Sequence, residues 1–158
     1  MAGASLSLGL ELDSVSNINA SFDYNNFNMK QESTPKSTFQ GPIYGHGFSY
    51  TYEQLTKNRY TGYNASADYQ RFFNKERTKN IVISYQFSTS PNYSRDWRYY
   101  NNITGYPVIN YGDSYSDGQT RGTEHTIQID YTTPMGKGQT INTGSKFVSH
   151  LNKSDSKF

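Results

Sequence analysis

The chain is organised in short stretches in which apolar and polar residues alternate strictly. A period of two places every second side chain on the same face of a β-strand. Six stretches show this pattern, and their apolar members are Leu6, Leu8, Leu10 and Leu12; Ile18, Ala20, Phe22 and Tyr24; Tyr63, Ala65, Ala67 and Tyr69; Ile81, Ile83, Tyr85 and Phe87; Ile127, Ile129 and Tyr131; and Ile141 and Phe147. The pattern predicts an all-β chain, an antiparallel meander of about six amphipathic strands.

The connections between these predicted strands alternate between short and long. Short turns are expected at about 13–16, 74–80 and 132–139, and long loops at about 26–62 and 89–123. Short turns at one rim and long loops at the other are typical of outer-membrane β-barrels, in which the short turns are periplasmic. The alternation of lengths therefore predicts that the strands form part of a transmembrane barrel wall.

Residues 43–54 also alternate, with Tyr44, His46, Phe48, Tyr50 and Tyr52 on one side. Counting them as a further full span would move the 74–80 turn to the rim of the long loops. We therefore interpret them as one arm of a hairpin inside the first long loop.

Composition agrees with an all-β chain. The sequence is 33% hydrophobic with a mean hydropathy of -0.87, yet it contains 15 Tyr and 9 Phe. No stretch reaches the roughly 20 apolar residues of a spanning helix, and aromatic residues at this density argue against disorder. The net charge of +2 is scattered along the chain, so a nucleic-acid partner is not expected. The absence of Cys excludes disulfides and thiolate metal sites.

The two predicted faces differ in a way that favours a membrane barrel over a soluble sheet. Ionisable residues within the strands gather on the polar face, and aromatic residues recur at strand ends, as in the interfacial girdles of barrels. The residues predicted to face lipid are Leu6, Leu8, Leu10, Ile18, Phe22, Ala67, Ile83, Tyr85, Ile127 and Ile129. Those predicted to face the lumen are Glu11, Asp23, Asp68, Gln86, Asp130 and Lys146.

Six strands are fewer than the roughly eight with which single-chain bacterial barrels begin. We therefore expect the chain to be an internal segment of a larger barrel, with outer-membrane lipid and the remainder of that barrel as its partners. Residues 1–4 show no basic segment followed by an apolar core, so no signal peptide is visible. The N-terminal part of the exported protein is accordingly expected to lie outside this sequence.

Several motifs resemble the Bacteroidetes outer-membrane β-barrel family related to TonB-dependent receptors. They are the strand–turn–strand stretch 5–16 (SLSLGLELDSVS) followed by 20–22 (ASF), then 67–73 (ADYQRFF), 83–88 (ISYQFS), 127–132 (IQIDYT), 134–138 (PMGKG) and 143–147 (TGSKF). The resemblance implies an outer-membrane location and a structural role in the uptake of a nutrient. It also implies an energy-coupling partner that acts through an N-terminal part not contained in this chain.

The second long loop carries the candidate ligand-binding residues Tyr93, Trp97, Tyr99 and Tyr100, interspersed with Arg95, Asp96 and Arg98. Exposed aromatic rings beside charged groups suit stacking on a sugar or contact with a peptide, but packing of the loop on itself explains them more simply. A rival interpretation of the whole chain is a soluble β-sandwich or jelly-roll binding module that uses this aromatic loop for carbohydrate.

No pattern of catalytic or metal-ligating residues stands out. His46, His125 and His150 are isolated in sequence, and no Gly-x-Ser-x-Gly turn is present. Residues 113–118 (DSYSDG) have the wrong Asp spacing for a calcium loop and are interpreted as a turn. The sequence therefore predicts no enzyme, no metal and no cofactor.

Overall fold

The computed structural model describes residues 1–40, 47–105, 112–136 and 138–158. The predictions made for Tyr44 and His46, and for Lys137 within the stretch 134–138, lie outside these described residues. Within them the chain consists of β-strands and connections. No described helix has the length and apolarity needed to cross a membrane.

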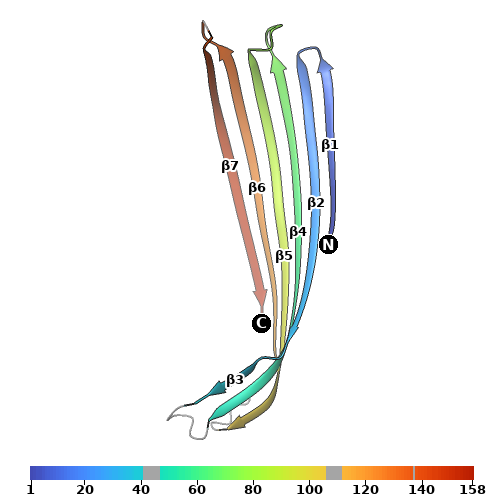
Figure 1. The fold of residues 1–158 in the computed structure, drawn as a ribbon, viewed down its shortest axis with the longest axis vertical. Coiled ribbons are helices and arrows are strands. Elements are labelled where there is room, and N and C mark those ends of the chain that lie inside the picture. Colours follow the sequence, from blue (N-terminus) through green and yellow to red (C-terminus); the bar gives the residue numbers. More distant parts are fainter. Residues whose placement is uncertain (41–46, 106–111, 137) are drawn as a thin grey trace. The chain divides into compact units, whose positions relative to one another are not determined.

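The strands form one sheet whose order follows the chain (Figure 1). Their bounds are β1 Ala2–Asp13, β2 Ser16–Ser33, β3 Lys36–Phe39, β4 Phe48–Phe72, β5 Asn80–Gly105, β6 Ser114–Pro134 and β7 Thr140–Lys157. The order across the sheet is β1-β2-β4-β5-β6-β7, and the short β3 pairs with β4 off this path. The predicted all-β antiparallel meander is thus confirmed. The sheet is open, and β1 and β7 are its edge strands.

Most strands are longer than their apolar alternation predicts. The strands β4 and β5 have 25 and 26 residues, and β2 continues to Ser33. Much of the predicted loops 26–62 and 89–123 is therefore strand, including residues 48–54, which are the first part of β4. Outside residues 48–54, polar residues are frequent on both faces of these extensions, so the apolar alternation weakens although the strands continue.

The short connections are held by side-chain and backbone hydrogen bonds. The β1–β2 turn begins with Asp13, whose Oδ1 accepts a hydrogen bond of 2.8 Å from the Val15 N–H. In the β4–β5 turn, the Phe73 N–H donates to the Lys79 carbonyl at 2.8 Å. The Asp13 bond is of the Asx type, which favours a tight turn because the side chain replaces a backbone partner.

The residues divide into two compact units. Unit 1 comprises Met1–Asn26, Thr61–Pro91 and Arg121–Lys153; unit 2 comprises Phe27–Tyr60, Asn92–Thr120 and Ser154–Phe158. Unit 1 has no fully covered apolar side chain among its described residues. In unit 2, Phe48 is buried at 3% exposure, where it stacks on Phe39 at 5.8 Å and lies beside Tyr50. Among the residues that the structure describes, neither unit has the two-layer core of a sandwich.

Candidate functional site

The apolar face of unit 1 begins on the β1–β2 pair. The register sets Leu6 opposite Phe22, Leu8 opposite Ala20 and Leu10 opposite Ile18. Residues directly opposite in an antiparallel pair share a face, so these predicted lipid-facing residues lie together. Leu6 and Leu8 remain 70% and 66% exposed, because nothing in the described chain covers this face.

The same face continues onto β4. The rings of Tyr24 and Tyr63 lie 5.3 Å apart, and the hydroxyls of Ser21 and Ser66 form a hydrogen bond of 2.8 Å on the other side. Alternation along β4 then places Ala67 with Tyr63 and Asp68 with Ser66. Ala67 therefore shares the face of the leucines, and Asp68 lies on the opposite face.

Beyond the β4–β5 turn, β5 and β6 repeat this division. The Tyr85 hydroxyl and the His125 Nδ1 are 2.8 Å apart, and the Phe87 and His125 rings are 5.1 Å apart. Alternation from Tyr85 and His125 puts Ile83, Ile127 and Ile129 on their face, and Gln86 on the opposite one. Ile83, Ile127 and Ile129 are exposed.

The opposite face of unit 1 is polar. Asp23 accepts a hydrogen bond from Ser5, and Glu11 lies opposite Asn17. On β6 the Gln128 amide donates to Asp130 at 2.7 Å. The Cα of Gly144 faces Asp130 so closely that a side chain there would collide with the carboxylate. Lys146, two residues further along β7, therefore shares the face of Asp130.

Unit 2 contains the residues predicted to bind a ligand, and it separates them. Tyr93 and Trp97 point to one side of β5, whereas the Tyr100 ring contacts Tyr50 and Tyr52 of β4 at 5.6 and 5.5 Å. Alternation places the exposed Tyr99 with Trp97. The four aromatic residues therefore do not form a single platform.

The side of Tyr93 and Trp97 carries three cross-strand pairs between β5 and β6, which we call the β5–β6 ladder. The Gln119 amide donates to the Tyr93 hydroxyl at 3.1 Å, Arg95 Nε lies 3.1 Å from Asp117, and the Trp97 and Tyr115 rings are 5.4 Å apart. Residues 114–117 are thus part of β6, which corrects their interpretation as a turn. This polar stretch forms a strand because Tyr115 and Asp117 contact side chains of β5.

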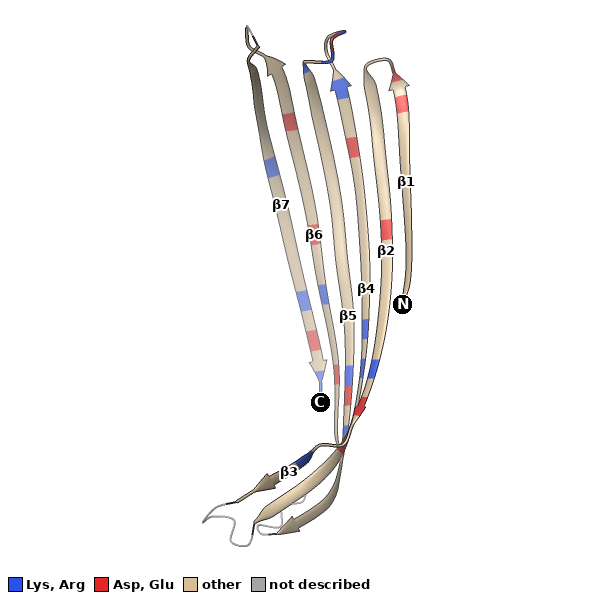
Figure 2. Ribbon diagram, viewed as in Figure 1, with Lys and Arg blue, Asp and Glu red and all other residues tan. Residues whose placement is uncertain are grey.

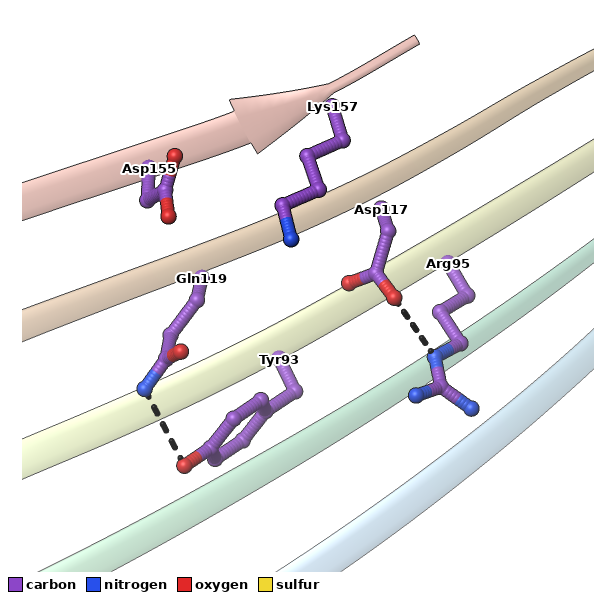
Figure 3. Close-up of a pocket in the computed structure, with 6 residues that line it drawn as sticks. All are labelled: Tyr93, Arg95, Asp117, Gln119, Asp155 and Lys157. Atoms are coloured by element: carbon purple, nitrogen blue, oxygen red, sulfur yellow. Dashed lines mark hydrogen bonds and ion pairs between the residues drawn. The ribbon is translucent and has the colours of Figure 1, made fainter.

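A hollow of about 200 Å³ adjoins this ladder in unit 2. Its walls are Tyr93, Arg95, Asp117, Gln119, Asp155 and Lys157, and Figure 3 shows the Lys157 chain reaching into the space beside Asp117. The Tyr115 hydroxyl also donates to Asp117 at 2.9 Å, and this hydrogen bond raises the pKa of Tyr115. Most polar groups here are already paired within the sheet, which favours a structural role over ligand binding.

The other side of unit 2 is centred on Asp96. Its Oδ2 accepts hydrogen bonds of 2.6 Å from Gln54 and 2.8 Å from Thr56, and Arg98 Nε lies 3.0 Å from its Oδ1. Partial burial raises the pKa of Asp96, but these hydrogen bonds and the Arg98 charge together bring the pKa below its usual value. The sequence does not reveal this group because Gln54 and Thr56 lie 40 or more residues away from Asp96 along the chain.

The described residues contain no group of three His, Cys, Asp or Glu side chains arranged to hold a metal ion. The two faces of unit 1 and the paired groups of unit 2 are thus the features from which a function can be argued.

Comparisons with known proteins identify no family for this chain. No family model matches the chain, and no curated protein matches it. Among solved structures, the chain is similar to part of the membrane pore complex of pneumolysin, with 9% identity and a TM-score of 0.23. The match covers 87% of this chain and 31% of the pneumolysin chain. A similarity this weak carries no argument about fold or function.

Proposed function

We propose that the chain forms part of the wall of a transmembrane β-barrel in a bacterial outer membrane, with a structural role in nutrient uptake. The observation that carries the proposal is the uncovered apolar face of unit 1, opposite a polar face on the same strands. Moving one exposed Leu side chain from water into an apolar environment is favourable by about 1.5–3 kcal/mol of free energy. The row of exposed leucines on β1 is therefore more stable in an apolar environment, such as the hydrocarbon of a lipid bilayer.

The strand lengths within unit 1 support a membrane span. The part of β2 in unit 1 runs from Ser16 to Asn26 and the part of β4 from Thr61 to Phe72. A tilted strand needs about 9–11 residues to cross the hydrocarbon layer. These parts meet that length.

The polar face supports a hydrated lumen. Asp68, Asp130 and Lys146 lie on it, and charged groups are tolerated on the inner face of a barrel because water solvates them. The role in nutrient uptake, with an energy-coupling protein as a further partner, rests on the motif resemblance alone. The rest of the barrel wall would come from strands that pair with β1 and β7.

The need for lipid or detergent tests the proposal. We expect the chain to be dispersed in detergent micelles or bilayers, and to aggregate in plain buffer through its apolar face and open edges. The measurement is light scattering after size-exclusion chromatography, with and without detergent. A monodisperse monomer that unfolds cooperatively in plain buffer contradicts the proposal and supports the soluble sandwich.

A further inference from the structure

The β4–β5 turn of unit 1 concentrates positive charge at one end of the sheet. Residues 71–79 (RFFNKERTK) contain four basic side chains and one acidic one. Figure 2 shows this charge at the end of β4 and in the turn that follows it. Among the described residues, neither Arg71, Lys75, Arg77 nor Lys79 has a carboxylate within ion-pair distance.

Asn74 fixes the conformation of this turn. Its side-chain amide donates to Thr78 at 2.7 Å and to Glu76 at 3.0 Å, and its Oδ1 accepts from the Lys79 N–H at 2.9 Å. The one carboxylate of the turn, Glu76, thus accepts from an amide rather than from a cation, and residues 71–79 carry a net charge of +3. The Arg77 guanidinium also donates to the Ser14 carbonyl at 3.1 Å, which ties the turn to its neighbour.

Aromatic rings lie directly beside these cations. The Arg77 guanidinium lies 5.3 Å from the Phe72 ring centre, and the Lys79 Nζ lies 6.0 Å from that of Phe73. Phe73 is 51% exposed and its ring is 6.5 Å from that of Tyr131. Aromatic rings prefer the boundary between hydrocarbon and water, while Lys and Arg keep their stems in apolar surroundings and extend their charges to the headgroups.

We propose that the β4–β5 turn binds the phosphate groups of anionic phospholipids in the membrane surface. The inference rests on the proposed function and names a partner for one rim of the wall. Phe73 and Tyr131 would lie at the headgroup level, and Lys75 and Lys79 would meet the lipid phosphates. Each basic residue near an anionic membrane surface strengthens binding through charge attraction, which weakens within a Debye length as salt is added.

The test uses the full chain and two kinds of vesicle, one of phosphatidylcholine alone and one with phosphatidylglycerol added. Partitioning is measured by vesicle flotation at low and high salt. The variant Lys75→Gln/Lys79→Gln removes two turn charges without removing a side-chain hydrogen bond. The control Lys146→Gln/Lys153→Gln removes the same charge from β7.

Phosphatidylglycerol is expected to strengthen partitioning of the unaltered chain at low salt, and the turn variant to lose roughly 10- to 30-fold of that partitioning. The control should keep it. Equal losses in both variants, or no response to phosphatidylglycerol while the chain still binds neutral vesicles, overturn the inference and leave the proposed function standing. Failure to bind either vesicle overturns both.

Discussion

Ile83 and Gln86 lie three residues apart on β5, and alternation directs their side chains to opposite faces of the sheet. Their surroundings differ accordingly. Ile83 follows the exposed apolar face with Tyr85, whereas Gln86 lies on the face of the carboxylates. The same charged residue placed at one or the other position therefore compares how the two faces are solvated, on the same strand.

We expect Ile83→Arg to destabilise the folded barrel by about 2–4 kcal/mol, because the charge would enter hydrocarbon near the bilayer midplane. The matched change Gln86→Arg should cost little, since its side chain points into water. Folding equilibria in bilayers, measured in the complete barrel to which the proposal assigns this chain, give both values. Equal destabilisation would mean that the faces are misassigned. A sandwich would also penalise Ile83→Arg, so the result is interpreted together with the detergent requirement.

Asp96 provides a pH-dependent contribution to unit 2. Its pKa in the folded chain is below the usual value of 3.8, so the unfolded chain takes up the proton first. The contribution is complete above that usual value and is lost as the pH falls through the lower pKa of the folded chain. Acidification below about pH 4 should therefore destabilise unit 2.

Asp96→Asn should reduce the loss of stability that unit 2 shows at acid pH. Fluorescence of Trp97, the single Trp of the chain, reports unfolding there in a urea titration at each pH. Asp155→Asn, which removes an equal charge from β7, is the control. An unchanged pH profile in Asp96→Asn, or an equal change in the control, contradicts the assignment.

Among the elements, the β6–β7 pair leaves no room for a side chain at Gly144. A Cβ added at Gly144 would meet the Asp130 carboxylate and would lie 2.8 Å from the Ile129 carbonyl oxygen. The carbonyl belongs to the ladder and cannot move without disturbing the pairing. By contrast, a Cβ at Gly118 on the same strand pair would meet ordinary contacts at 3.9 Å.

Gly144→Ala should therefore destabilise the chain by about 1–3 kcal/mol, the usual cost of overpacking a well-fitted site. Gly118→Ala should be neutral or slightly stabilising, because Ala loses less backbone entropy than Gly on folding. Urea unfolding in detergent, followed by circular dichroism at the β-sheet band, measures both. A neutral Gly144→Ala would show that β7 can shift away from β6 at no cost.

Across the whole molecule, the sequence predicts those parts of the sheet in which apolar and polar side chains alternate. The apolar runs around Leu8, Ile83 and Ile129 are visible because one face is apolar and the other polar. From Lys30 to Ser33 the strand β2 has polar residues on both faces, so the alternation no longer marks it as a strand. Pairs such as Tyr93 with Gln119 depend on a strand register that composition does not reveal. The contact between the exposed ring of Phe73 and Lys79 depends on the fold of the turn and cannot be seen in the sequence.

The sequential strand order has a consequence for how the sheet assembles. Each long strand pairs with the strand that precedes it along this path, and β1 and β2 are joined through Ser14 and Val15 alone. Closing a short loop costs little conformational entropy, so zipping can start at a hairpin turn and proceed pair by pair. No strand has to wait for a distant part of the chain before it finds its neighbour. Kinetically, the sheet can therefore grow by successive hairpins, each new strand adding to the edge left by the last.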